Sequence, residues 1–287
     1  METPLKILVL GSTGMLGHQV VSYLDQFEDL DIFNFSYKNK LNQKTIIVDA
    51  LDKVFLEKQI ISIKPDFIIN CIGLLIEGSQ NIERAQYLNT TLPNELKKIS
   101  KEIDSKLIHI STDCVFSGEI GSYKENDIRD GKGTYAETKI LGEIIDKENL
   151  TIRTSIIGPE LKSNGEGLFE WFMRQTNEVQ GYKNALWSGV TTLELSKAIR
   201  WAIKNNVNGL YHITNNKVIN KCDLLNLFKK YTKKNIKIIP FENKRVDKSF
   251  VDTRCLIDYV IPSYDEMVES MINEIRINKY LYSRYNI

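Results

Sequence analysis

The chain has 287 residues and carries 38 Lys and Arg against 37 Asp and Glu, a net charge of +1. This length allows a large core without disulfides or a structural metal, and the balanced charge argues against a nucleic acid partner. The most apolar run, residues 67–76, is much shorter than the roughly 20 residues that a membrane-spanning helix needs. We therefore expect a soluble cytoplasmic protein that contacts neither membrane nor nucleic acid.

The four cysteines are far apart and form no C-x-x-C pair, which excludes a zinc ribbon and provides no disulfide framework. The three histidines form no ligand cluster, so we expect no metal site. His109 and His212 each lie within a strand-like run, and we expect both in the core rather than in catalysis.

Short β-rich runs alternate with longer helical patterns in the first half of the chain. The predicted strands are residues 5–10, 31–36, 45–48, 66–71, 106–111 and 150–155, with a later one at 209–213. The predicted helices are residues 14–27, 51–63, 82–103, 134–147 and 191–204. Continuous apolar strands alternating with helices are typical of βαβ units and of a parallel sheet that is covered on both faces.

A glycine-rich turn joins the first predicted strand to the first predicted helix, with the sequence Gly11-Ser12-Thr13-Gly14-Met15-Leu16-Gly17. Glycines allow positive φ values and the close approach of a pyrophosphate, and the helix start offers unpaired N–H groups. Because the turn follows a strand and opens a helix, it predicts a dinucleotide site. The expected contacts on this turn are Gly11, Thr13, Gly14, Met15, Leu16 and Gly17.

The residues about 20 positions beyond such glycines distinguish NADH from NADPH. No acidic residue that could bind the ribose hydroxyls of NADH occurs between positions 32 and 48, and Tyr37 is followed by Lys38 and Lys40. Two cations would attract a 2′-phosphate, so we expect NADPH; the alternative is a solvated basic loop. We expect Asp49, directly after the third strand, to accept from the adenine amino group.

Tyr135 and Lys139 lie four positions apart at the start of a predicted helix, so their side chains share one face. Such a pair also arises by chance, so the prediction of a catalytic pair depends on where the pair lies in the fold. The preceding strand ends in Ser111, Thr112 and Asp113, at the carboxyl edge where open parallel sheets bind ligands.

Reduction of a ketone needs a hydride on carbon and a proton on oxygen. We expect Tyr135 to donate the proton, with the Lys139 ammonium lowering the pKa of the phenol and holding the nicotinamide ribose. We expect the Thr112 hydroxyl to hydrogen-bond the carbonyl oxygen and Asn89 to support a water relay to Lys139. The alternative is a surface pair without catalytic function.

The pattern changes after Ser155, where a Gly-, Pro- and Asn-rich stretch precedes a cluster of aromatic residues. We expect residues 1–155 to form an α/β, Rossmann-like core with a doubly wound parallel sheet that binds NADP. We expect residues 190–214 to return to that core, and most of residues 156–287 to form a smaller, mixed α/β substrate-binding lobe.

Further motifs occur in order along the chain. They are residues 65–71 (PDFIINC), residues 110–118 (ISTDCVFSG), Tyr123-x-Glu125, Gly142-Glu143 and Arg153-Thr154-Ser155. With the glycine turn and the Tyr135-x-x-x-Lys139 pair, the chain resembles the dTDP-4-dehydrorhamnose reductase family of extended short-chain dehydrogenases/reductases. The resemblance is dense over residues 5–160 and thinner afterwards.

The resemblance implies NADPH-dependent reduction of the 4-keto group of a nucleotide-linked 6-deoxysugar for surface polysaccharide. The family often has Tyr where this chain has Cys114, which leaves the sugar and the choice between dTDP and UDP open. The sequences of residues 70–73 and 153–158 are more similar to those of a branch of the family that acts on UDP-linked N-acetylamino sugars. The implied partner is the nucleotide sugar, with a homodimer left open.

The expected cofactor-binding set also includes Cys71, Ile72, Gly73, Asn89, Tyr135 and Lys139. The expected substrate-binding residues are Asp113, Cys114, Lys183, Trp187 and Arg245. Among these, the lobe residues would supply cations for the diphosphate and an aromatic surface for stacking.

Two other functions stay open. Sugar-nucleotide dehydratases and epimerases of the same superfamily resemble this chain, but the dehydratases carry Thr-Asp-Glu where this chain has Thr112-Asp113-Cys114. The beta subunit of methionine adenosyltransferase resembles the same family and serves as a non-catalytic regulator. Retention of Thr112, Tyr135 and Lys139 favours an enzyme.

Overall fold

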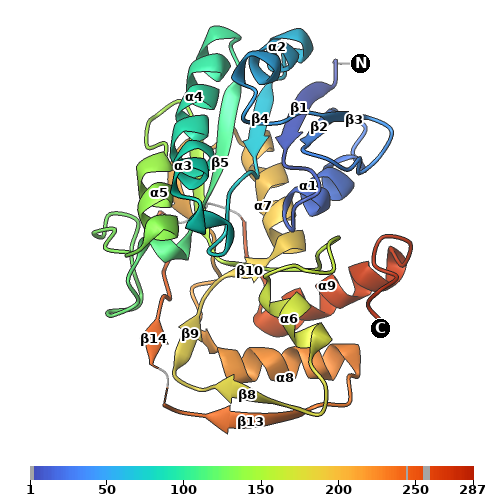
Figure 1. Ribbon diagram of the computed structural model, residues 1–287, viewed down its shortest axis with the longest axis vertical. Coiled ribbons are helices and arrows are strands. Elements are labelled where there is room, and N and C mark those ends of the chain that lie inside the picture. Colours follow the sequence, from blue (N-terminus) through green and yellow to red (C-terminus); the bar gives the residue numbers. More distant parts are fainter. Residues whose placement is uncertain (1–2, 244, 255–258) are drawn as a thin grey trace.

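The computed structural model describes residues 3–243, 245–254 and 259–287, and within these residues a seven-stranded parallel sheet forms the upper part of the molecule (Figure 1). Its strand order is β11-β6-β5-β4-β1-β2-β3. The strands are β1 (Leu5–Leu10), β2 (Leu30–Ser36), β3 (Thr45–Ile47), β4 (Phe67–Asn70), β5 (Lys106–Thr112), β6 (Leu150–Thr154) and β11 (Gly209–His212). The predicted doubly wound parallel sheet is confirmed, and its order reverses between β1 and β4, where such sheets bind ligands.

Helices cover both faces of the sheet. α1 (Gly17–Leu24) and α7 (Thr192–Lys204) pack on one face, and α2 (Lys53–Ile63) and α4 (Leu92–Glu102) pack on the other. Successive residues of β1 alternate between the two resulting cores, with Ile7 and Val9 in the first and Leu8 and Leu10 in the second. This two-sided burial explains why β1 is apolar throughout its second half.

The helices differ from prediction where glycine or proline interrupts them. The helix predicted at 82–103 is divided into α3 (Ile82–Gln86), the π-helical turn η2 (Tyr87–Thr91) and α4. Pro93, in the first turn of α4, has no N–H to continue the preceding ladder. The helix predicted at 134–147 is α5 (Thr134–Gly142). A Cβ at Gly142 would lie 1.8 Å from the carbonyl oxygen of Asn89, so α5 and η2 meet closely there.

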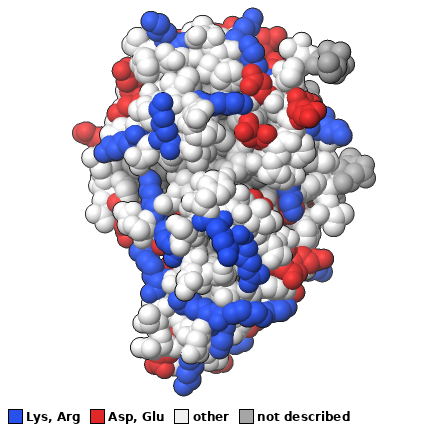
Figure 2. Space-filling model, turned by 90° about the vertical axis from the view of Figure 1, so that its right-hand side faces the viewer, with Lys and Arg blue, Asp and Glu red and all other residues white. Residues whose placement is uncertain are grey.

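The remaining elements of the described chain form the lower lobe in Figure 1 and include three small sheets, which are separate from the seven-stranded sheet. They are β7 (Ile156–Ile157), α6 (Leu168–Arg174), β8 (Glu178–Tyr182), β9 (Ala185–Trp187), β10 (Val190–Thr191), β12 (Ile219–Asn220), α8 (Lys221–Thr232), β13 (Lys237–Phe241), β14 (Val246–Asp247) and α9 (Tyr264–Ile277). Figure 2 shows Lys and Arg side chains gathered over the lower part of one face. None of the helices in the described part of the chain has the length and apolarity to cross a membrane.

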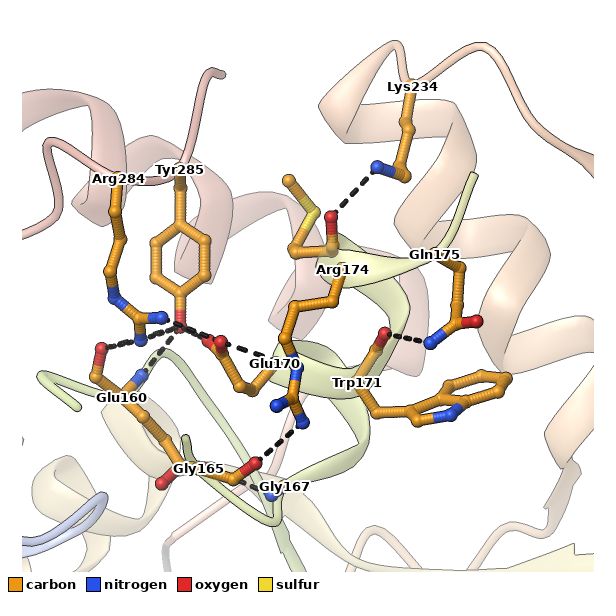
Figure 3. A network of polar contacts seen from close by, with 11 residues as sticks. Glu160, Gly165, Gly167, Glu170, Trp171, Arg174, Gln175, Lys234, Arg284 and Tyr285 are labelled. Atoms are coloured by element: carbon orange, nitrogen blue, oxygen red, sulfur yellow. Dashed lines mark hydrogen bonds and ion pairs between the residues drawn. The ribbon is translucent and has the colours of Figure 1, made fainter. Parts of the chain in front are cut away.

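The C-terminal residues bind the lobe segment that leads into α6 (Figure 3). Arg284 donates to Glu170 Oε1 at 2.6 Å and to the Glu160 carbonyl oxygen. The Tyr285 hydroxyl donates to Glu170 Oε2 at 2.5 Å and accepts from the Glu160 N–H at 2.9 Å. These bonds hold the segment between Glu160 and α6 against the C-terminus.

A buried ion pair connects the sheet to α5. Arg153 Nε and Nη2 donate to the two Glu143 carboxylate oxygens at 2.9 and 2.8 Å, and neither side chain is exposed to solvent. Ser111 Oγ donates to the same carboxylate at 2.6 Å, and Arg153 Nη1 donates to His212 Nε2 at 2.9 Å. The motif residues Glu143 and Arg153 therefore belong to a structural network. His212 is fully buried, as is His109, which confirms the prediction for both.

Candidate active site

The glycine turn after β1 leaves no room for side chains at Gly11 and Gly17. Gly11 has φ +79°, and a Cβ there would lie 3.2 Å from the Cys71 carbonyl carbon. A Cβ at Gly17 would lie 2.1 Å from the Gly11 carbonyl oxygen. Within the described chain, the backbone N–H groups of Thr13, Met15 and Leu16 have no acceptor. Three free donors at the start of α1 form a suitable cradle for an anion.

The turn is supported from behind by His18, which is fully buried. Burial lowers the pKa of His18 to about 4, so the imidazole is neutral at physiological pH. Its Nδ1–H therefore donates to the Gly14 carbonyl oxygen at 2.7 Å, and its Nε2 accepts from the Tyr282 hydroxyl at 2.8 Å. The C-terminal segment thus contacts the candidate cofactor turn, a link between residues that are far apart in the sequence.

Two cations lie over the ring of Tyr37, just beyond the end of β2. Lys38 Nζ is 4.9 Å from the ring centroid, and the Arg84 guanidinium carbon is 5.7 Å from it. Arg84 Nε is buried and has no hydrogen-bond partner among the described residues. Within the described chain, no carboxylate forms an ion pair with Lys38, Lys40 or Arg84. Sequence reasoning missed Arg84 because it comes from α3, on the other side of the sheet's switch point.

Two other predicted cofactor residues lie at the carboxyl edge of the sheet. Asp49 follows β3, and its side chain accepts from the Leu51 N–H at 3.0 Å. The buried Asn89 amide pairs with both backbone groups of Leu74 and donates to Thr138 Oγ1 at 3.1 Å. Asn89 thus fixes the loop after β4, where Cys71, Ile72 and Gly73 lie. Among the described residues it makes no direct hydrogen bond to Lys139.

Thr112, Tyr135 and Lys139 converge at the carboxyl end of β5. A hydrogen bond joins the side chains of Thr112 and Tyr135. The Lys139 ammonium is buried and donates to the Ile110 carbonyl oxygen at 2.8 Å, and burial lowers the pKa of Lys139 to about 8. Burial raises the pKa of Tyr135, and only the Thr112 hydrogen bond opposes this shift. The net shift of the Tyr135 pKa is therefore upward, opposite to the expected lowering, because desolvation dominates.

Asp113 and Cys114 continue β5 into the 3₁₀ turn η3 (Asp113–Val115). Thr112 Oγ1 donates to Asp113 Oδ1 and accepts from the Cys114 N–H, both at 3.1 Å. The Lys248 side chain hydrogen-bonds Cys114, whose pKa burial raises to about 11. Lys221 interacts electrostatically with both Asp113 and Cys114. The sequence contains no motif around Lys221 or Lys248 that would have selected either lysine.

The three predicted lobe residues differ in their surroundings. Lys183 is on the surface and forms an ion pair with Asp223 at 3.1 Å, and its predicted contact with the diphosphate stays a prediction. Trp187 is only 3% exposed, with Tyr264 packed at 5.7 Å and Lys221 Nζ 5.3 Å from its ring, so it offers no open face for stacking. The buried Trp187 ring therefore packs in the lobe. Arg245 is exposed, and its role stays a prediction.

Comparison with known proteins decides the family. The model of the RmlD substrate-binding domain family matches residues 5–276. The chain belongs to this family. This confirms the resemblance found in the sequence motifs, and the family model extends it well into the lobe.

Relatives of this RmlD-family chain include the dTDP-4-dehydrorhamnose reductase of Escherichia coli, 27% identical over 224 residues that cover 73% of this chain and 72% of that protein. The Mycobacterium tuberculosis enzyme of the same name is 34% identical over 85 residues, and that match spans only 27% of this chain and 28% of that protein. The Bacillus anthracis dTDP-4-dehydrorhamnose reductase, solved in complex with NADP, is 20% identical with a TM-score of 0.82, covering 95% of this chain and all of that one. The structural likeness shows the shared fold.

Proposed function

We propose that this RmlD-family protein is an NADPH-dependent reductase of the 4-keto group of a nucleotide-linked 6-deoxysugar. The observation that carries the proposal is the convergence of Thr112, Tyr135 and Lys139 at the end of β5. This end lies at the same edge of the sheet as the glycine turn, which follows β1. A proton donor beside a dinucleotide cradle is the arrangement that a ketoreductase needs.

Each residue has a distinct task in this reaction. Bound NADPH supplies a hydride to the C4 carbon of the sugar. The Tyr135 hydroxyl gives its proton to the C4 oxygen, and its raised pKa keeps it protonated at neutral pH before the reaction. The Thr112 hydroxyl hydrogen-bonds the same oxygen, and the Lys139 ammonium stabilises the phenolate that remains and binds the nicotinamide ribose.

The residues around the glycine turn fit NADPH. The three free N–H groups of the turn suit the pyrophosphate, and Tyr37, Lys38 and Arg84 suit the 2′-phosphate. Two cations beside one ring repel each other unless an anion lies between them, which favours a phosphate at this place.

We expect replacement of both Lys38 and Lys40 by Ala to weaken NADPH binding by about 10- to 100-fold and to leave NADH binding nearly unchanged. The reason is that only NADPH carries the 2′-phosphate. The measurement is the Kd of each cofactor by fluorescence titration. Lys44→Ala, which removes an exposed lysine paired with Asp25 at 3.3 Å, is the matched control. Equal losses for the two cofactors would contradict the assignment.

The substrate part of the proposal rests on the family and on Cys114. A dehydratase needs a base at this position to remove the C5 proton, whereas burial raises the pKa of the Cys114 thiol to about 11 and keeps it protonated. This favours reduction over elimination. We further propose that the product is used for surface polysaccharide. The sugar is carried on dTDP, or on UDP as an N-acetylamino sugar.

The test is direct. The purified protein is incubated with NADPH and either a dTDP-linked or a UDP-linked 4-keto-6-deoxysugar, and the loss of NADPH absorbance is followed together with the product's C4 configuration. We expect oxidation of NADPH with one of the two nucleotide classes. If neither substrate causes oxidation although NADPH binds, the protein is a non-catalytic NADP-binding subunit and the reductase proposal is wrong.

A further inference from the structure

The C-terminal segment reaches the glycine turn through a buried chain of hydrogen bonds. The Gly14 carbonyl oxygen can only accept, so His18 Nδ1, which lies 2.7 Å away, carries the proton of the imidazole. Because the imidazole is neutral, its Nε2 is an acceptor, and the buried Tyr282 hydroxyl donates to it at 2.8 Å. Tyr282 therefore fixes the tautomer in which His18 can donate to the turn.

The bond from His18 orients the peptide unit between Gly14 and Met15. This peptide is trans, as are all peptide bonds of the described chain, so the Gly14 carbonyl and the Met15 N–H point in opposite directions. Gly14 has no Cβ to restrict its backbone. The His18 side-chain bond to this carbonyl is 2.7 Å long, and the helical bond from the His18 N–H is 3.2 Å long. The side chain thus holds the Met15 N–H, which has no acceptor among the described residues, on the side away from His18.

The same C-terminal segment also approaches Met15 from the lobe. The Tyr285 hydroxyl accepts from the Glu160 N–H at 2.9 Å, and the Arg284 guanidinium donates to the Glu160 carbonyl oxygen (Figure 3). The Glu160 carboxylate accepts from the Gly167 N–H at 2.7 Å. A Cβ at Gly167 would lie 3.0 Å from Met15 Sδ, so this lobe segment packs closely against the Met15 side chain. Two chains of contacts therefore lead from the C-terminal segment to the turn.

We propose that Tyr282, acting through His18, positions the Met15 N–H to bind the pyrophosphate of the dinucleotide. This inference rests on the cofactor part of the proposed function. Burying a hydroxyl and an imidazole costs desolvation that apolar side chains of similar size would avoid. In return, this pair fixes the direction of one of the three free donors of the turn. Both are positioning residues, because they contact the turn and not the ligand.

The experiment measures the Kd of NADPH and of NADH by fluorescence titration. It also measures the Kd of 2′-AMP, which has the 2′-phosphate but no pyrophosphate, by calorimetry. We expect Tyr282→Phe to weaken both dinucleotides by about 3- to 10-fold and His18→Leu to weaken both by about 10- to 30-fold. Binding of 2′-AMP should not change. His18→Asn, whose amide nitrogen can replace Nδ1, should resemble Tyr282→Phe rather than His18→Leu.

The matched control is Tyr264→Phe. This variant also removes a buried tyrosine hydroxyl, which donates to the Lys217 carbonyl oxygen at 2.6 Å in the lobe. We expect its Kd values to equal those of the wild type, because the lost bond does not lead to the glycine turn.

The outcomes separate the inference from the proposed function. If Tyr282→Phe and His18→Leu bind both dinucleotides as the wild type does, the positioning role is wrong while the reductase proposal stands. If 2′-AMP binding falls by the same factor, or if Tyr264→Phe gives the same losses, the two residues only maintain the fold, and the inference is again wrong. If the wild type binds neither dinucleotide, the cofactor assignment is wrong and the inference falls with it.

Discussion

Replacing Tyr135 by Phe is expected to lower kcat by about 10²- to 10⁴-fold while NADPH binding is retained. The variant keeps the ring that packs at the end of β5 and loses only the hydroxyl that hydrogen-bonds Thr112. Without it, no side chain gives a proton to the C4 oxygen, and the alkoxide must take its proton from water. The measurement is steady-state reduction of the active nucleotide sugar, with the NADPH Kd determined separately.

The matched control for this variant is Tyr280→Phe, because Tyr280 is 78% exposed near the C-terminus and carries no proposed role. We expect its kcat to equal that of the wild type. Near-normal turnover of Tyr135→Phe would show that another group donates the proton, and the proposed role of Tyr135 would have to be abandoned.

Replacing Arg153 by Met is expected to lower the free energy of unfolding by about 3–5 kcal/mol. The substitution leaves the Glu143 carboxylate buried with Ser111 and the partly exposed Arg129 as its remaining donors. It also removes the donor to His212 Nε2 on β11, so the sheet loses a link between its edge and α5. Urea denaturation followed by circular dichroism measures the change.

Two further variants make this result interpretable. Lys53→Met breaks an exposed ion pair with Glu95, 2.8 Å long, and should leave the unfolding free energy nearly unchanged. The double variant Arg153→Met with Glu143→Met should recover part of the loss, because it no longer leaves a buried charge without its partner. A loss below about 1 kcal/mol for Arg153→Met alone would mean that water reaches Glu143.

The candidate site could be predicted from sequence wherever a local pattern encodes it. The glycine turn is recognisable because its strand, its glycines and its helix are contiguous. Tyr135 and Lys139 are recognisable because one helical turn separates them. The pKa of Tyr135 was predicted in the wrong direction because it depends on desolvation by the surrounding structure, which spacing along a helix does not report.

The amino-acid sequence by itself determined the parallel sheet, the dinucleotide turn and the Thr112, Tyr135 and Lys139 set, because alternation, glycine position and helical spacing are short-range properties. Only the tertiary structure decided which cations approach the two ends of the site. Arg84, Lys221 and Lys248 come from three separate segments of the chain, and His18 meets Tyr282 across nearly the whole chain. Many lysines and arginines in the chain are equivalent in sequence terms. Folding distinguishes them, because it pairs some with carboxylates at the surface and leaves others desolvated beside the site.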